Sequence, residues 1–201
     1  MKLEQIFSVS LIYASIRSAT PIIYAALCAA ITQQADILNI GTEGIMLTGA
    51  FAAVAVSYFS GSWFMGILAA MMAGFVISGI MAVGHIKYKA DICAIGMGIN
   101  LFALAITKFM LNVIFDTSGT FTDPDVKAIP RVDIPFIKNI PILKDIFNDW
   151  AVTEWFMIVL ILILTFLLYR TRWGLRLRAV GQFPMAAQTA GINVISMKYQ
   201  A

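Results

Sequence analysis

Charge is scarce in this chain of 201 residues, because Asp, Glu, Lys and Arg together make up only 12% of it. A soluble domain carries about 25% charged residues and about 45–50% apolar ones. This chain is 60% hydrophobic, with a mean hydropathy of +0.86. The shortage of charge excludes an ordinary soluble globular domain and indicates a membrane protein with several spans.

Residues for catalysis and metal binding are also scarce. His85 is the single histidine, and no set of carboxylate or cysteine ligands surrounds it in the sequence. Cys28 and Cys93 lie in apolar stretches without metal-ligand spacing, so we interpret them as small buried residues. The sequence contains no G-x-x-x-x-G-K-[S/T] loop, HExxH motif or serine nucleophile elbow. It therefore predicts no catalytic residue, no metal site and no cofactor, and it places any nucleotide hydrolysis on another protein.

Long apolar segments are what the chain does contain. A helix rises about 1.5 Å per residue, so about 20 residues cross roughly 30 Å of hydrocarbon. The segments that qualify are residues 6–31, 45–59, 63–83, 92–115 and 155–169. The second and the fifth are only marginally long, which leaves tilted or re-entrant geometry open for them. We predict an all-α, polytopic bundle of about five transmembrane helices, in a single transmembrane domain over residues 1–201.

The placement of basic residues predicts the sidedness. Residues 84–89 and the segment 170–201 are both basic, and an even number of spans separates them. Both are therefore predicted to be cytoplasmic by the positive-inside rule. The long connection over residues 116–154 then faces outward, with seven acidic and four basic residues. Counting back along the spans places residues 33–42 inside and the N-terminus outside. Four prolines interrupt the outer connection: Pro124, Pro130, Pro135 and Pro141.

The third span carries a row of small residues at every fourth position. The row consists of Gly66, Ala70, Gly74, Ser78 and Ala82. Small residues at this spacing allow helix backbones to approach closely in lipid. The pattern predicts close packing, either within the chain or between two copies of it.

A polar, glycine-rich element over residues 39–44 lies between the first two spans. Glu43 falls in the opening turn of the next helix, where the helix dipole favours a carboxylate, or it lines a solute pathway. Asn100 lies deep in the fourth span and either bonds another helix or contacts solute. We therefore take Asn39, Glu43 and Asn100 as candidates for the substrate pathway. The element lies at the cytoplasmic surface or folds back into the membrane.

A short helix is predicted over residues 184–190, near the end of the cytoplasmic segment. Pro184 suits the first helical position and Gly191 the left-handed position just beyond the last turn. Two turns of helix are not stable alone, so this helix has to dock on something.

This closing segment resembles a known family. Residues 173–181, followed by Pro184, Ala186, Ala187 and residues 190–194, are similar to the cytoplasmic coupling region of bacterial ABC importer permeases. The branch is the one that serves ribose-type sugars and nucleosides. Residues 38–50 resemble the "NIG-EG-M" element of nucleoside-type permeases, and residues 91–101 resemble the span after the first cytoplasmic turn. Sugar-type relatives carry an aspartate in the glycine element, so Glu43 favours nucleosides.

The resemblance implies a multi-pass permease subunit of the cell membrane that moves nucleosides or simple sugars by alternating access. Its implied partners are a cytoplasmic ATPase subunit, a second permease subunit (homologous or identical), an extracytoplasmic solute-binding lipoprotein and membrane lipid, without nucleic acid. The residues implied in coupling to the ATPase are Gly181, Pro184, Ala186, Ala187, Ala190, Gly191 and Asn193. Arg172, Arg176 and Arg178 either position this helix or only anchor the chain at the cytoplasmic surface.

One departure from the family and two alternatives accompany this interpretation. Permeases of the family continue with further spans after the coupling helix, so we expect the chain to be truncated at its C-terminal end. An ion-coupled secondary carrier that uses Asp36 and Glu43 as cation sites is one alternative. A membrane accessory protein without transport activity is the other.

Overall fold

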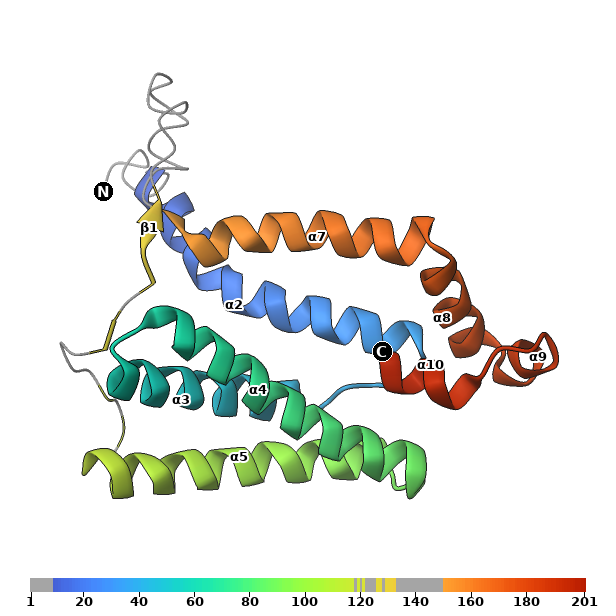
Figure 1. Ribbon diagram of the computed structural model, residues 1–201, viewed down its shortest axis with the longest axis horizontal. Coiled ribbons are helices and arrows are strands. Elements are labelled where there is room, and N and C mark those ends of the chain that lie inside the picture. Colours follow the sequence, from blue (N-terminus) through green and yellow to red (C-terminus); the bar gives the residue numbers. More distant parts are fainter. Residues whose placement is uncertain (1–8, 118, 120, 122–125, 128, 133–149) are drawn as a thin grey trace, which may run out of the picture. The chain divides into compact units, whose positions relative to one another are not determined.

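The computed structural model describes residues 9–117, 119, 121, 126–127, 129–132 and 150–201. Five helices in this part of the chain are long and apolar enough to cross a membrane (Figure 1). They are α2 (Val9–Gln34), α3 (Thr42–Ser60), α4 (Trp63–Ala82), α5 (Ile92–Phe115) and α7 (Val152–Arg170). The all-α, polytopic prediction is confirmed. The two spans that looked marginal in sequence are helices of 19 residues each, about 28 Å long and so close to the hydrocarbon thickness.

The chain divides into two compact units, the first formed by residues 1–27 and 129–166. In this unit the Tyr24 hydroxyl, on α2, donates a hydrogen bond of 2.7 Å to the carbonyl of Thr153 at the start of α7. A short antiparallel ladder joins β1 (Arg131–Val132) to β2 (Trp150–Ala151) just before α7. The buried carboxylate of Glu154 accepts a hydrogen bond of 3.0 Å from the amide of Ala151. Polar backbone groups at this end of α7 are thereby paired.

Much of the predicted outer connection lies outside the described residues. This holds for Pro124, Pro135 and Pro141, whereas the fourth proline, Pro130, accepts a backbone hydrogen bond of 3.3 Å from Val152. The prediction that residues 116–154 face outward stays a prediction.

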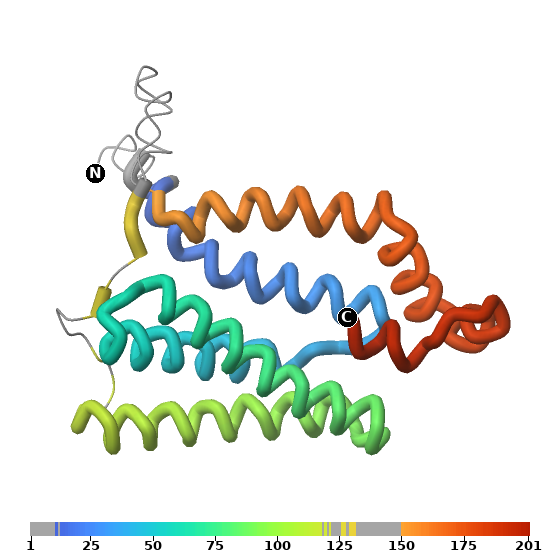
Figure 2. The backbone as a smooth tube through the Cα atoms, viewed as in Figure 1, coloured from blue at the N-terminus to red at the C-terminus, as the bar shows by residue number. Residues whose placement is uncertain are grey.

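The second unit contains residues 28–128 and 167–201, and α3, α4 and α5 pack together in it (Figure 2). Three small residues of the row, Gly66, Ala70 and Gly74, lie against α3. A Cβ atom on Gly66 would lie 2.8 Å from the carbonyl oxygen of Ala53, and one on Gly49 of α3 would lie 3.6 Å from that of Ala70. Of the two interpretations of the row, the structure shows packing within the chain.

Helix α4 ends in a π-helical turn, η1 (Val83–Lys87), before α5 begins. Asp91 caps α5, because its side chain accepts a hydrogen bond of 2.9 Å from the amide of Ala94. His85 lies in η1, with Nδ1 3.1 Å from the carbonyl oxygen of Ala90. The basic turn predicted between the third and fourth spans is therefore an ordered, hydrogen-bonded turn.

Three short helices follow the last span in the second unit. They are α8 (Arg172–Gln182), α9 (Pro184–Thr189) and α10 (Val194–Gln200). Thr171 follows α7 and caps α8, since its hydroxyl oxygen accepts a hydrogen bond of 3.2 Å from the amide of Gly174. Helix α9 is the short helix predicted from the sequence, whereas the residues of α8 were predicted only as a basic segment.

The three short helices share a small hydrophobic core with the end of α2 and the end of α7. Its buried members are Ala35, Leu168, Leu177, Val180, Ala187 and Met197. Leu177 and Val180 of α8 are completely buried. This core fixes the position of α9.

The contact between α3 and α4 yields a first prediction. Gly66→Ala forces a methyl group against the carbonyl of Ala53, and we expect a loss of about 1–3 kcal/mol in unfolding free energy. Gly79→Ala is the matched control, because no atom lies within 4 Å of its added Cβ. The control is expected to be neutral or to stabilise by up to about 1 kcal/mol through helix propensity. Thermal unfolding in detergent micelles measures both, and equal stability of the two variants would contradict the close packing.

Candidate functional site

Three segments that are far apart in the sequence meet at one end of the second unit. Gly181 of α8 lies so close to the α2–α3 connection that any Cβ there would collide with the carbonyl oxygen of Gln34 and come within 3.2 Å of the amide of Asp36. Helix α10 also contacts η1. The connections over residues 33–42, 84–89 and 170–201 therefore share one end, as the predicted common sidedness requires.

Asn100 connects α5 to the polar element between α2 and α3. Its Oδ1 accepts a hydrogen bond of 2.7 Å from the amide of Gly44, and its Nδ2 donates one of 3.0 Å to the carbonyl of Ile40. Both ends of the side-chain amide are therefore engaged by backbone. Of the two interpretations of Asn100, the structure shows the bond between segments of the chain.

Glycines make this contact possible. A Cβ on Gly96 of α5 would lie 3.0 Å from the amide nitrogen of Gly41 and 3.0 Å from the Cβ of Ile40. A Cβ on Gly44 would lie 2.9 Å from Oδ1 of Asn100. The backbone of the polar element can thus rest directly on α5, and larger residues at these positions would push it away.

The other two pathway candidates are placed differently. The Oδ1 atom of Asn39 is buried and has no hydrogen-bond partner among the described residues. Glu43 is exposed in the first turn of α3. The three candidates thus belong to one neighbourhood, in which each polar end of the Asn100 side chain makes one backbone bond, whereas Oδ1 of Asn39 has no partner among the described residues and Glu43 is exposed. Their assignment to a solute pathway stays a prediction.

Helix α9 begins and ends at the predicted signals. Pro184 is its first residue, and Gly191 beyond its end has a φ of +82°. The amide of Ile192 donates a hydrogen bond of 3.0 Å back to the carbonyl of Ala187. Such a bond is typical of a helix whose C-terminus is followed by a residue in the left-handed conformation. The helix ends at Thr189, one residue before the predicted end.

Only one side chain of α9 faces the core. Ala187 is buried, whereas Pro184, Ala186 and the following Ala190 are exposed. Met185 is 85% exposed and the preceding Phe183 is 71% exposed. The helix is therefore held from one side and uncovered on the others.

Two predicted coupling residues also have a role in the fold, one of them buried (Ala187) and one exposed (Asn193). Ala187 is part of the hydrophobic core. Asn193 caps α10, because its Oδ1 accepts a 3.0 Å hydrogen bond from the amide of Ser196. Sequence reasoning missed Phe183 and Met185 as surface residues. The signal that could have revealed them was the presence of two large apolar residues on either side of the proline that starts a short helix.

Comparison with known proteins gives a consistent result. Residues 11–201 match the family described as branched-chain amino acid transport system / permease component. The chain is 37% identical to the guanosine ABC transporter permease protein NupQ of Bacillus subtilis, with 99% of this chain and 64% of the relative covered. It is 31% identical to the nucleoside ABC transporter permease protein NupC of Lactococcus lactis, with 90% and 58% covered.

A third relative is the putative glucose ABC transporter permease protein TsgC13 of Haloferax volcanii, at 25% identity, with 97% of this chain and 58% of the relative covered. The chain spans less than two thirds of the length of these three relatives. No solved structure matches it.

The double hydrogen bond of Asn100 leads to a second prediction. Asn100→Leu leaves the amide of Gly44 and the carbonyl of Ile40 unpaired, which we expect to cost about 1–3 kcal/mol of unfolding free energy. Ser78→Ala is the control, since that hydroxyl bonds only the Phe75 carbonyl of its own helix, at 3.1 Å. Unfolding in detergent measures the difference in stability between the two variants. An Asn100 variant as stable as the Ser78 variant would show that the two hydrogen bonds of Asn100 do not stabilise the fold.

Proposed function

The chain belongs to the family of branched-chain amino acid transport system permease components, and from this membership we propose that it works as the membrane-embedded permease part of an ATP-driven importer. The match supports the resemblance seen in the closing segment, and it makes the chain a transport component of the membrane rather than an enzyme. The ATPase that drives it, the solute and the other partners are parts of the proposal.

The observation that carries the proposal is the exposure of α9. A helix of six residues does not persist alone in water, yet this one is ordered because Ala187 attaches it to the core. Met185 and Phe183 leave large apolar surfaces uncovered beside it. Exposed apolar surface of this kind marks an interaction site, and a groove on a cytoplasmic ATPase subunit would cover it.

A continuous set of contacts leads from α9 to the spans. Ala187 packs in the same core as Val180 of α8. Gly181, next to Val180, touches the backbone of Gln34 at the end of α2. The connection that follows is bonded to Asn100 of α5. A displacement of α9 by the ATPase would therefore move the α2–α3 connection and α5 together, as alternating access by rigid-body motion requires.

Nucleosides are the proposed solutes. Two of the relatives are named for guanosine and for nucleosides, while a third is named for glucose. Glu43 in the polar element also favours the nucleoside type. We propose Asn39 and Glu43 as groups that meet the solute and Asn100 as their support. A second permease subunit and an extracytoplasmic solute-binding lipoprotein would complete the transporter.

The exposed face of α9 provides the third prediction. Met185→Asp places a charge in the proposed apolar contact, and we expect capture of the co-expressed ATPase subunit to fall by about tenfold or more. Ile195→Asp is the matched control, because Ile195 is 62% exposed on α10. Both variants should unfold at the wild-type temperature. Docking through α9 would be contradicted if Met185→Asp captured the ATPase subunit as well as the wild type does, or if both variants lost capture equally.

A fourth prediction concerns the solute and its energy source. The assembled transporter in vesicles should take up labelled guanosine when ATP reaches the ATPase, with adenosine competing and ribose competing poorly. Glu43→Gln, an exposed site that leaves the fold intact, should lower uptake without lowering capture of the ATPase. Uptake driven by a proton gradient in vesicles without an ATPase would instead support the ion-coupled carrier.

A further inference from the structure

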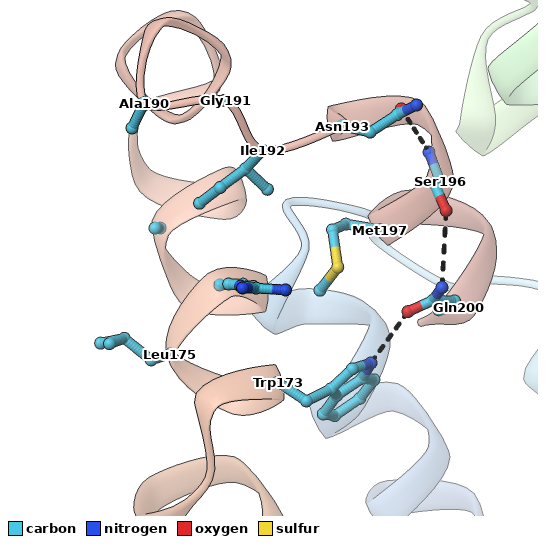
Figure 3. Close-up of a pocket in the computed structure, with 11 residues that line it drawn as sticks. Trp173, Leu175, Ala190, Gly191, Ile192, Asn193, Ser196, Met197 and Gln200 are labelled. Atoms are coloured by element: carbon cyan, nitrogen blue, oxygen red, sulfur yellow. Dashed lines mark hydrogen bonds between the residues drawn. The ribbon is translucent and has the colours of Figure 1, made fainter.

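A pocket of about 660 Å³ lies between α8 and the segment that runs from the end of α9 through α10 (Figure 3). Its lining is amphipathic. Trp173, Ile192 and Met197 form apolar walls, and the polar members are Arg176, Asn193, Ser196 and Gln200. Such a lining fits a ligand that has both a polar and an apolar end.

A chain of hydrogen bonds shapes the polar side of the pocket (Figure 3). The indole Nε1 of Trp173 donates to Oε1 of Gln200 at 3.0 Å, and Nε2 of Gln200 donates to Oγ of Ser196 at 3.4 Å. The first of these bonds ties α10 to α8, and the second lies within α10. Arg176 is the charged residue of the lining, and it forms no ion pair with any residue in the described part of the chain. Its guanidinium keeps all of its donors for a ligand.

The charge around the pocket has one sign. Residues 170–201 contain five Lys or Arg residues and no Asp or Glu. An anionic ligand is therefore attracted to this segment, and no carboxylate within the segment opposes it.

The distance from the membrane core narrows the choice of anion. The span α7 ends at Arg170, and Arg176 follows six residues later, so at about 1.5 Å per residue it lies at most about 9 Å farther along a helix. The polar layer of a bilayer is roughly 5–8 Å deep on each side. Trp173 adds an aromatic residue of the kind enriched at that level. The pocket is thus within reach of lipid headgroups.

We propose that this pocket binds the headgroup of an anionic phospholipid of the cytoplasmic leaflet. The guanidinium of Arg176 pairs with the phosphodiester, and Asn193 and Ser196 offer hydrogen bonds to its oxygens or to headgroup hydroxyls. Trp173 contacts the glycerol and the first methylene groups. This inference does not rest on transport of any solute.

Quenching of Trp173 tests the proposal. The full chain is placed in phosphatidylcholine vesicles that contain a small fraction of brominated phosphatidylglycerol, or of brominated phosphatidylcholine. The contribution of Trp173 is the difference between the wild type and Trp173→Phe. We expect phosphatidylglycerol to be preferred by about fivefold, the weight of one basic residue near an anionic surface.

Two arginine variants separate the pocket from general surface charge. Arg176→Gln should remove the preference for phosphatidylglycerol. Arg172→Gln is the matched control, because Arg172 is exposed on the same helix but does not line the pocket, so it should keep most of the preference.

Three results would overturn the proposal. Equal quenching by the two brominated lipids would show no headgroup selection. Equal losses in the two arginine variants would assign the effect to surface charge. Suppression of the preference by millimolar inorganic phosphate would show that the pocket takes a free anion and not a lipid.

Discussion

Burial of Leu177 and Val180 is the constraint on which the end of the second unit that holds α8, α9 and α10 depends. Water drives apolar side chains together only where the chain has left the lipid. Inside the bilayer the surrounding tails are as apolar as leucine, so helices there rely on close backbone contact and hydrogen bonds. The structure uses both regimes. Gly66 brings α4 against α3, Asn100 bonds the α2–α3 connection, and a compact hydrophobic core holds α8, α9 and α10.

Much of the fold was predictable because it depends on local signals. The predicted fourth span has the same bounds as α5, Ile92–Phe115, since Asp91 stops one helix pattern and starts another. Pro184 and Gly191 defined α9 for the same reason. Helix α8 was not predicted, because its arginines led us to interpret the segment only as a basic surface. Trp173, Leu177 and Val180 recur at intervals of four and three residues, which is the spacing of a helix with one buried face.

The site was less predictable because its decisive contacts join distant parts of the chain. An asparagine within a span bonds either another helix or a solute, and both roles need the same side chain. Only the proximity of Asn100 to Ile40 and Gly44 separates them. Likewise, nothing next to Gly181 in the sequence reveals that the backbone of Gln34 occupies the space of its missing side chain. Local sequence patterns determine where the helices lie, whereas contacts between distant segments determine what residues such as Asn100 and Gly181 do.

The attachment of α9 through Ala187 alone has an evolutionary consequence. The inward position is fixed by packing, while Met185 and its exposed neighbours make no contribution to the core. Substitutions on the outer face therefore leave the fold intact. With the proposed ATPase contact on this face, duplicated permeases in one cell could diverge there and each keep its own partner, so the specificity of assembly could evolve separately from stability.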